Sequence, residues 1–234
     1  MRVYQRHRWD MSYSEASFLQ HELRKRVRFR PLSLGKIRYV AGADIAIRKS
    51  KSQLISAVCV HQFPGLDMIE TRVAVTRLTF PYIPGLLSFR EIPSLIACLQ
   101  KVISRVDVVL CDGHGIAHPR GLGLASHLGL LLRKPTIGCA KSVLVGTYGN
   151  LGRERGDYCP LVYEGSRVGS VLRTREGVKP VFVSPGHLID QASSRRVVLA
   201  CSGKYRLPEP IRSADRLAGV EKRRLVLDAS RTET

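Results

Sequence analysis

The segment IRYVAGADIAI, residues 37–47, alternates apolar side chains with small or polar ones and opens a series of strand-like segments. LISAVCVHQF, residues 54–63, and TRVAVTRLT, residues 71–79, follow it, with a Pro-Gly pair between them. Alternation with a period of two, interrupted by turn residues, is typical of consecutive antiparallel strands. Residues 37–79 therefore predict a three-stranded antiparallel meander.

Signals for helices and buried strands alternate after this meander. Ser88 and Glu91 form a Ser-x-x-Glu signature that predicts a helix to about Ser104. VDVVLCD, residues 106–112, is a short apolar run of the kind that is buried on both faces of a sheet. Further predicted elements are a helix at 122–132, strands at 135–140 and near 161–163, 167–173 and 181–184, and a helix after Gly186. Together they predict an α/β fold, a mixed sheet with helices on both faces.

The length of 234 residues favours a single domain, 1–234. At its N-terminal end, Ser12 and Glu15 match a capping box that predicts a basic helical segment to about Phe29. Residues after about Arg224 are expected to form a loosely attached tail.

The charge of the chain favours a polyanionic partner. Lys and Arg number 38 against 19 Asp and Glu, a formal charge of +19. Neutralising phosphates releases counterions, so nucleic acid is the natural partner. Residues 1–51 hold 13 Lys or Arg and 4 Asp or Glu, which leaves +9, with RKRVRFR at 24–30 the densest run. A solvated surface explains such a run equally well when it stands alone.

Cysteine usage and hydropathy exclude other classes of protein. The six cysteines form no C-x-x-C pair and most lie in apolar stretches, which predicts a reduced core without disulfides or zinc. The longest apolar runs, such as VVLAC at 197–201, are far too short to cross a bilayer, and no apolar region follows the basic N-terminus. A cytoplasmic protein without membrane association is expected.

Two aspartates fall where an α/β fold places its sites. Asp44 lies in the first strand on the face opposite Ala43 and Ile45, and Asp112 ends the 106–112 strand. Side chains at the carboxyl ends of neighbouring strands meet. Converging carboxylates repel, and a divalent cation such as Mg²⁺ relieves that repulsion. A lone Asp at a strand end more often forms a turn, so the pair within a basic protein is what favours a metal site.

Glu91 and three histidines are further candidates. The capping box already explains Glu91, although a carboxylate at a helix start can also face a metal. His187, in VFVSPGHLID, is predicted between a strand and a helix, where the helix dipole favours the neutral imidazole that orients or deprotonates water. An ordinary structural histidine is the alternative. His114 and His118 lie in the Gly-rich DGHGIAHPRG, where they bind phosphate or order the loop.

The chain carries five long motifs in a specific order: VAGADIA, FPYIPGLLSFRE, VDVVLCDGHGIAHPRGLGLASHLG, PTIGCAKS and VSPGHLID. With the later YRLPEPIRSAD they resemble the endonuclease V family of deaminated-base repair nucleases over residues 35–216. The resemblance implies a ribonuclease H-like fold and metal-dependent hydrolysis of DNA. Members recognise inosine and cut the second phosphodiester bond on its 3′ side, leaving the base in place, unlike a glycosylase.

The resemblance also implies roles for individual residues. The acidic motif positions fall on Asp44, Glu91 and Asp112, which would hold Mg²⁺, with Mn²⁺ able to substitute. The catalytic histidine falls on His187. Lys141 falls at a position near the scissile phosphate, where an ammonium stabilises developing charge, unless it is an ordinary surface lysine. Cleavage would leave a 3′-hydroxyl and a 5′-phosphate.

The PYIP motif is a wedge in this family. Its two prolines fix the backbone, and the ring of Tyr82 would replace part of the stacking lost when the lesion leaves the helix. A packed hinge before a helix is the alternative. Glycines in the pocket would let a base edge approach the backbone. The residues expected at the wedge and lesion pocket are Pro81, Tyr82, Ile83, Pro84, Gly85, Leu87, Gly113, Gly115 and His118.

Two other functions fit the same motifs. The first is an endoribonuclease that cuts inosine-containing RNA, for which a 2′-hydroxyl beside the scissile phosphate is the discriminator. The second is a basic nucleic-acid-binding protein without catalysis, which the complete set of motif carboxylates argues against. One site on one domain needs no symmetry, so a monomer is expected. The sequence identifies no protein partner.

Overall fold

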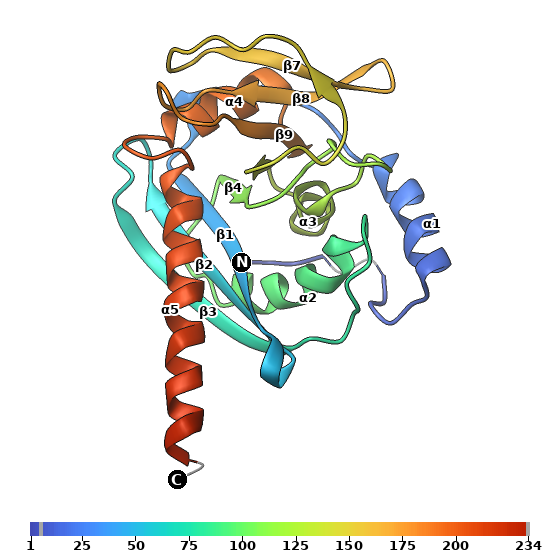
Figure 1. Ribbon diagram of the computed structural model, residues 1–234, viewed down its shortest axis with the longest axis vertical. Coiled ribbons are helices and arrows are strands. Elements are labelled where there is room, and N and C mark those ends of the chain that lie inside the picture. The colour runs from blue at the N-terminus through green and yellow to red at the C-terminus, as the bar shows by residue number, and fades with distance from the viewer. Residues whose placement is uncertain (5–6, 233–234) are drawn as a thin grey trace.

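The computed structural model describes residues 1–4 and 7–232 and contains a mixed sheet flanked by helices (Figure 1). The strands are β1 (Tyr39–Arg48), β2 (Gln53–Gln62), β3 (Met68–Arg77), β4 (Val108–Cys111), β5 (Thr136–Ala140), β6 (Thr147–Tyr148), β7 (Tyr158–Tyr163), β8 (Ser166–Leu172) and β9 (Val181–His187). The α-helices are α1 (Tyr13–Arg24), α2 (Leu87–Leu99), α3 (Leu124–Leu132), α4 (Gln191–Ala200) and α5 (Glu209–Thr232).

The strand order is β3-β2-β1-β4-β5-β9-β8-β7-β6. The predicted meander is confirmed, because β1 pairs with β2 and β2 with β3 in antiparallel fashion. β4 then lies parallel to β1 and β5 parallel to β4, and all four residues of β4 are buried, as its apolar sequence predicts. β9 returns antiparallel to β5. The expected ribonuclease H-like mixed sheet is therefore present.

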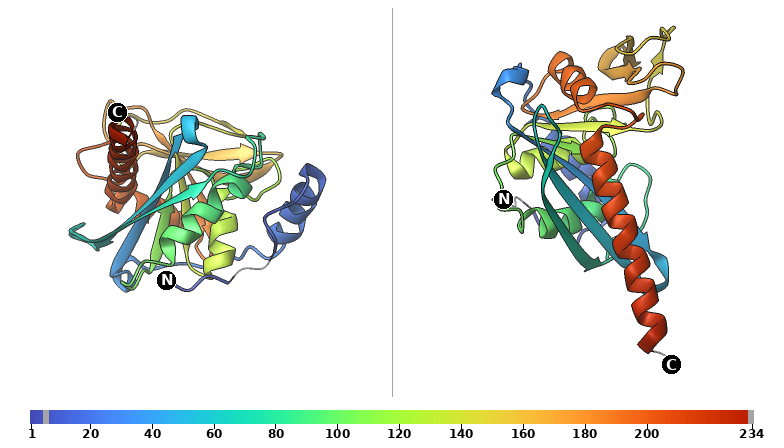
Figure 2. Two further views of the ribbon diagram at one scale, coloured as in Figure 1. Left: turned by 90° about the horizontal axis from the view of Figure 1, so that it is seen from below. Right: turned by 90° about the vertical axis from the view of Figure 1, so that its left-hand side faces the viewer.

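Helices cover both faces of this sheet (Figure 2, left). Alternate residues of β1 point to opposite faces: Ala41 packs with Leu95 of α2 and Leu128 of α3, whereas Val40 packs with Val197 of α4 and residues of α5. Burial of each large apolar side chain stabilises the fold by about 1.5–3 kcal/mol. The first helix, α1, lies outside α2 and α3 in the same view.

The capping box of α1 is confirmed. Ser12 Oγ accepts from the Glu15 backbone N–H at 3.3 Å, and Glu15 Oε2 accepts from the Ser12 N–H at 2.7 Å. The helix ends at Arg24 and not near Phe29, because the chain beyond it is extended and bonds through its backbone to the segment after β9.

The residues after Arg224, predicted to form a loosely attached tail, belong to a helix in the structure. α5 continues as a regular helix to Thr232, and an ion pair one turn apart, Arg224 to Glu221 at 2.7 Å, supports its exposed part. The last turns project beyond the edge of the sheet (Figure 2, right).

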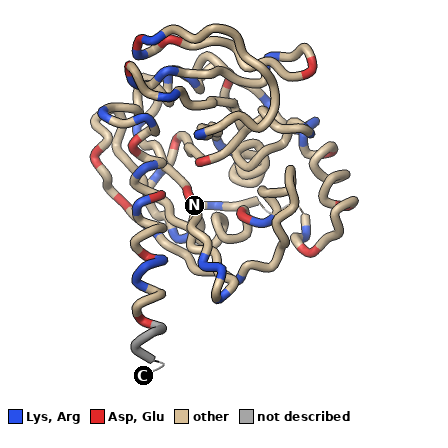
Figure 3. The backbone as a smooth tube through the Cα atoms, in the orientation of Figure 1, with Lys and Arg blue, Asp and Glu red and all other residues tan. Residues whose placement is uncertain are grey.

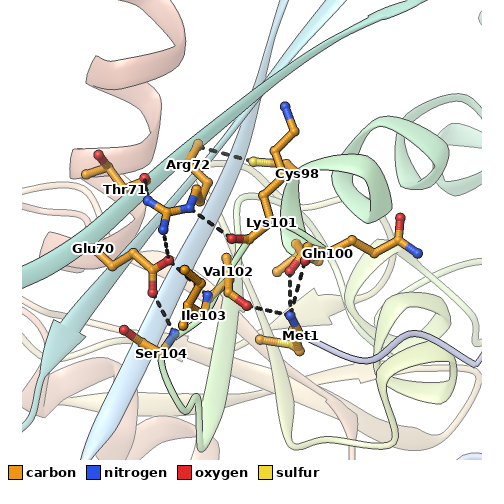
Figure 4. Close-up of polar contacts among 11 residues, drawn as sticks. Met1, Glu70, Thr71, Arg72, Cys98, Gln100, Lys101, Val102, Ile103 and Ser104 are labelled. Atoms are coloured by element: carbon orange, nitrogen blue, oxygen red, sulfur yellow. Dashed lines mark hydrogen bonds and ion pairs between the residues drawn. The ribbon is translucent and has the colours of Figure 1, made fainter.

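The C-terminal end of α2 is tied to the edge strand β3 (Figure 4). Glu70 accepts hydrogen bonds from the backbone N–H groups of Ile103 at 2.9 Å and Ser104 at 2.7 Å. Arg72 pairs with Glu70 at 2.7 Å and donates to the Lys101 carbonyl at 2.9 Å. These bonds satisfy backbone groups just beyond the helix and so fix α2 on the sheet.

We expect Glu70→Ala to lower the free energy of unfolding by about 2–3 kcal/mol, because two N–H groups and Arg72 lose their partner. Burial raises the pKa of Glu70, but the bonds from Ile103 and Ser104 and the Arg72 charge bring it below the ordinary value. A lowered carboxyl pKa contributes stability that is present above the unfolded pKa and is lost as the pH falls through the folded pKa.

Urea denaturation of the wild type, Glu70→Ala and the exposed-site control Glu176→Ala at pH 7 and pH 3 tests this expectation. The difference between wild type and Glu70→Ala should shrink at pH 3. Equal stabilities at pH 7 would show that this contact contributes nothing.

Candidate active site

Asp44 and Asp112 lie side by side at the carboxyl ends of adjacent parallel strands, as predicted. Ala43 of β1 is level with Cys111 of β4, and the Asp112 N–H donates to the Ala43 carbonyl at 3.3 Å. Burial, followed by the charge of Asp112, raises the pKa of Asp44 to about 7. The two carboxylates therefore repel each other in a site of low polarity.

Glu91 joins them from the first turns of α2, but not as a capping residue. The residue before the helix is Leu86, which makes no side-chain cap, and Ser88 Oγ bonds His127 Nδ1 at 3.1 Å. A capping box with Ser88 as the N-cap requires a helix that begins at Phe89, whereas α2 begins two residues earlier, at Leu87. The predicted capping box was therefore wrong. Burial, followed by the charge of Asp44, raises the pKa of Glu91 to about 8.

Lys141 follows β5 and reaches the same carboxylates. Its Nζ lies 2.7 Å from Asp112 Oδ2. Burial lowers the pKa of Lys141, but the hydrogen bond and charge of Asp112 outweigh it and raise that pKa overall. An ammonium held in this way is a fixed charge of the site, not an ordinary surface lysine.

Asp215 of α5 is a further acidic residue at this site that was not predicted from the sequence. α5 presses directly on β1: a Cβ at Gly42 would lie 2.0 Å from the Pro210 carbonyl oxygen, so only glycine permits this approach. The charge of Asp215 raises the pKa of both Asp44 and Lys141. The only signal was the aspartate in YRLPEPIRSAD, because nothing local shows that this helix returns to β1.

His187 does not reach the carboxylates, and the prediction that it activates water was wrong. His187 is the last residue of β9 and pairs with Thr136, the first residue of β5. Lys141, in contrast, directly follows the last residue of β5. Because β9 runs antiparallel to β5, His187 lies at the opposite end of the sheet. The ring Nδ1 of His187 accepts from the Arg28 backbone N–H at 3.2 Å, and the backbone N–H of His187 donates to Thr136 Oγ1 at 3.0 Å.

The tip of the PYIP motif is exposed. Tyr82 keeps 69% of its surface exposed, and the Arg90 guanidinium lies 5.8 Å from the centre of its ring. Beneath the tip, Ile83 packs against the buried Phe80 and Phe89. An exposed aromatic ring on a buried base argues against the packed-hinge alternative.

A pocket of about 160 Å³ separates this tip from the loop after β4. Of the predicted residues, Tyr82, Ile83, Pro84, Gly85, Leu87, Gly113 and His118 line it, and Ser88, His114, Gly123, Leu124 and Leu144 complete the wall. Pro81 and Gly115 do not line it. A Cβ at Gly115 would lie 2.1 Å from the Pro185 carbonyl oxygen, so this glycine serves the packing of the loop against β9.

The two histidines of the Gly-rich loop have different surroundings. His118 Nδ1 accepts from the Arg120 N–H at 3.1 Å, so its Nε2 donates to the Gly85 carbonyl at 3.0 Å. Gln20 of α1 and Arg120 donate to the same carbonyl at 3.0 and 2.7 Å, which fixes the pocket to α1. Within residues 1–4 and 7–232, His114 Nδ1 is buried without a hydrogen-bond partner, and burial lowers the pKa of His114 to about 4.

The donor set suits a hard divalent cation, because carboxylate oxygens are its preferred ligands. Burial, followed by neighbouring negative charge, raises the pKa of two of these carboxyls. In the described part of the chain, no three His, Cys, Asp or Glu side chains are arranged as a finished metal site. Lys141 lies on Asp112 instead, so side chains must turn to bind a cation. All six cysteines are buried and unpaired, as expected for a reduced core.

The fold and site define a class of protein: a nuclease that gathers carboxylates at strand ends, beside an exposed tyrosine and a pocket. Lys and Arg are spread over loops, sheet edges and α5 (Figure 3), so a polyanion can be contacted from several elements. Across the residues that the structure describes, no helix has the length and apolar character needed to cross a membrane.

Comparisons with known proteins agree with this class. The Endonuclease V family model matches residues 21–216. Endonuclease V of Trichormus variabilis is 48% identical over 218 residues, covering 93% of this chain and 99% of that protein. The crystal structure of Endonuclease V from Streptomyces avermitilis superimposes with a TM-score of 0.89 at 40% identity, over 98% of this chain and 100% of the other. The chain belongs to the endonuclease V family, which confirms the predicted family and its hydrolase class.

A third comparison is a nucleic-acid complex. An Endonuclease V variant of Ciona intestinalis, 28% identical with a TM-score of 0.81 over 91% of this chain and 97% of the other, was crystallised with a 23mer DNA. That DNA contains an inosine followed by a ribo-adenosine.

Proposed function

We propose that this protein cuts DNA at the second phosphodiester bond 3′ to an inosine, leaving a 3′-hydroxyl and a 5′-phosphate. The observation that carries the proposal is that the pocket adjoins Asp112, which in turn neighbours Asp44 and Lys141. Gly113 and His114, which line the pocket, directly follow Asp112 in the chain. A base held in the pocket thus leaves its 3′ phosphates near the carboxylates. The DNA complex of the Ciona relative supports the substrate class.

The pocket residues would select the lesion. Tyr82 enters the stack, and a weakly paired hypoxanthine leaves it at low cost. The neutral His114 lines the pocket and would contact the displaced base there. The bonds to the Gly85 carbonyl keep the wall in place, so little ordering is needed on binding.

The acidic residues would hold Mg²⁺ or Mn²⁺, chiefly through Asp44 and Asp112, with Glu91 directly or through water and Asp215 from α5. A bound cation supplies charge neutralisation and lowers the pKa of the attacking water. Lys141 stabilises negative charge on the phosphate when Asp112 turns to the cation. Proton transfer falls to this carboxylate set and solvent, since His187 is too distant to take part.

A denaturing gel of end-labelled strands tests the function. Matched DNA and RNA strands, each with one inosine, are incubated with the protein and Mg²⁺ or EDTA, along with a DNA strand that has a single ribonucleotide after the inosine. A Mg²⁺-dependent product one nucleotide 3′ of inosine in DNA is expected. Binding without any product would favour a non-catalytic protein, and cutting only where a 2′-hydroxyl is present would favour the ribonuclease.

The exposed ring gives a further prediction. Tyr82→Ala should weaken binding of inosine-containing duplex about 10-fold, because a base–aromatic contact contributes roughly 1–3 kcal/mol. Binding to undamaged duplex should change much less. Fluorescence anisotropy in EDTA measures both, with Phe18→Ala, an aromatic of α1 with 69% exposure, as the control. Equal losses on damaged and undamaged DNA would remove the wedge role.

A further inference from the structure

Two adjoining hollows of about 230 and 530 Å³ extend beyond the lesion pocket. They share Phe29, Ile116 and Arg167, and we call them together the Phe29 groove. Arg24 and Tyr163 line one end and Arg195 lines the other. The basic run RKRVRFR at 24–30 contains Phe29 and contributes Arg24 to this groove.

The Phe29 groove continues the lesion pocket on the side away from the carboxylates. Pro185, near the end of β9, and Asp190 line the groove, and this end of β9 lies beside Thr136, at the opposite end of β5 from Lys141. His118 lines both the pocket and the groove. On the proposed function, the bond that is cut lies 3′ to the lesion, so the groove faces the strand on its 5′ side.

Phe29 is an exposed ring on a fixed backbone. Half of its surface, 50%, is exposed. The carbonyls on either side of it are bonded: Arg28 accepts from the Leu188 N–H at 2.7 Å, and Arg30 accepts from the Asp190 N–H at 2.9 Å. A pre-ordered aromatic surface of this kind stacks on any base without a large entropic penalty.

Positive charge accompanies the ring. Arg24, Arg167 and Arg195 line the Phe29 groove, against the carboxylates Glu164 and Asp190. Asp190 is engaged as the cap of α4 through its side chain. The Arg195 guanidinium is held 3.6 Å from the centre of the Tyr158 ring, and burial, with the charge of Arg167, lowers its pKa. Guanidinium groups bind phosphates through paired, charge-assisted hydrogen bonds.

We propose that the Phe29 groove binds an unpaired nucleotide of the cleaved strand on the 5′ side of the lesion. Its base stacks on Phe29, and its phosphates meet Arg24, Arg167 and Arg195. This subsite deepens the proposed function and rests on it. It also gives the basic run after α1 a substrate-binding role.

The experiment compares two single-stranded DNAs. One begins with inosine at its 5′ end, and the other carries five more nucleotides before it; both have the same 3′ flank. The wild type should bind the longer strand about 10-fold more tightly, the effect of one stacked base with its phosphate contacts. Phe29→Ala and Arg167→Glu should lose most of this advantage, and Phe29→Trp should keep it. Controls are Phe18→Ala and Arg153→Glu, which exchange exposed residues outside the groove.

Binding is measured in EDTA and cutting in Mg²⁺, so the subsite proposal and the proposed nuclease function are tested independently. The control variants Phe18→Ala and Arg153→Glu should cut both strands at the wild-type rate. An unchanged advantage in both groove variants, or an equal loss in the controls, overturns the subsite. If the wild type cuts neither strand, the proposed function fails, and the binding in EDTA still decides whether the groove holds the 5′ flank.

Discussion

Asp112→Asn is expected to reduce Mg²⁺-dependent cutting of inosine-containing DNA by about 10³-fold or more, and Asp44→Asn should do the same. Each change removes one charged oxygen donor from a set in which Asp44 and Asp112 are direct neighbours. In Asp112→Asn the Lys141 ammonium also loses its anionic partner. Affinity for the DNA should not fall, because each variant removes a negative charge from a surface that binds phosphates.

Single-turnover cleavage and anisotropy on the same labelled duplex separate the two effects. Asp67→Asn, an exposed aspartate in the turn between β2 and β3, is the matched control. Calorimetric titration with Mn²⁺ gives a readout that does not depend on cutting, and both active-site variants should bind the ion more weakly. Full activity in either variant would remove these carboxylates from the mechanism.

The part of this site that sequence reasoning could predict is the part set by neighbouring strands. Asp44 and Asp112 end up together because β1 and β4 are adjacent and parallel, which the rule of strand carboxyl ends already implies. The rule does not apply to His187, because β9 runs antiparallel to β5. His187 does end a strand, but that strand end lies at the edge of the sheet opposite to Asp44 and Asp112.

Contacts between residues far apart in the sequence were the other part of the site that could not be predicted. Asp215 reaches the site only because Gly42 lets α5 lie against β1, and Gln20 reaches the Gly85 carbonyl from α1. Neither contact has a local signature. Glu91 shows the reverse problem, since a local signature existed and was misleading: Ser-x-x-Glu occurs within α2, whose first turn comes earlier.

The same carboxylates should make the metal-free protein less stable as the pH rises from 5.5 to 8.5. The pKa values of Asp44 and Glu91 are raised to about 7 and about 8 in the folded state, against roughly 3.9 and 4.3 when unfolded. The folded protein therefore binds more protons across this window, and its stability is lost as the pH rises through the folded pKa values. We expect a decrease in Tm on the order of 5 °C.

Two comparisons isolate this effect in thermal unfolding scans. Asp44→Asn with Glu91→Gln removes both groups and should flatten the Tm between pH 5.5 and 8.5. Burial lowers the pKa of His114 and His118 to about 4, so these two remain neutral throughout the window. Mg²⁺ should raise the Tm of the wild type more at pH 8.5 than at pH 5.5, because its ligands must be deprotonated to bind. A Tm that rises with pH in the metal-free wild type alone would mean that these carboxyls do not hold protons in the folded state.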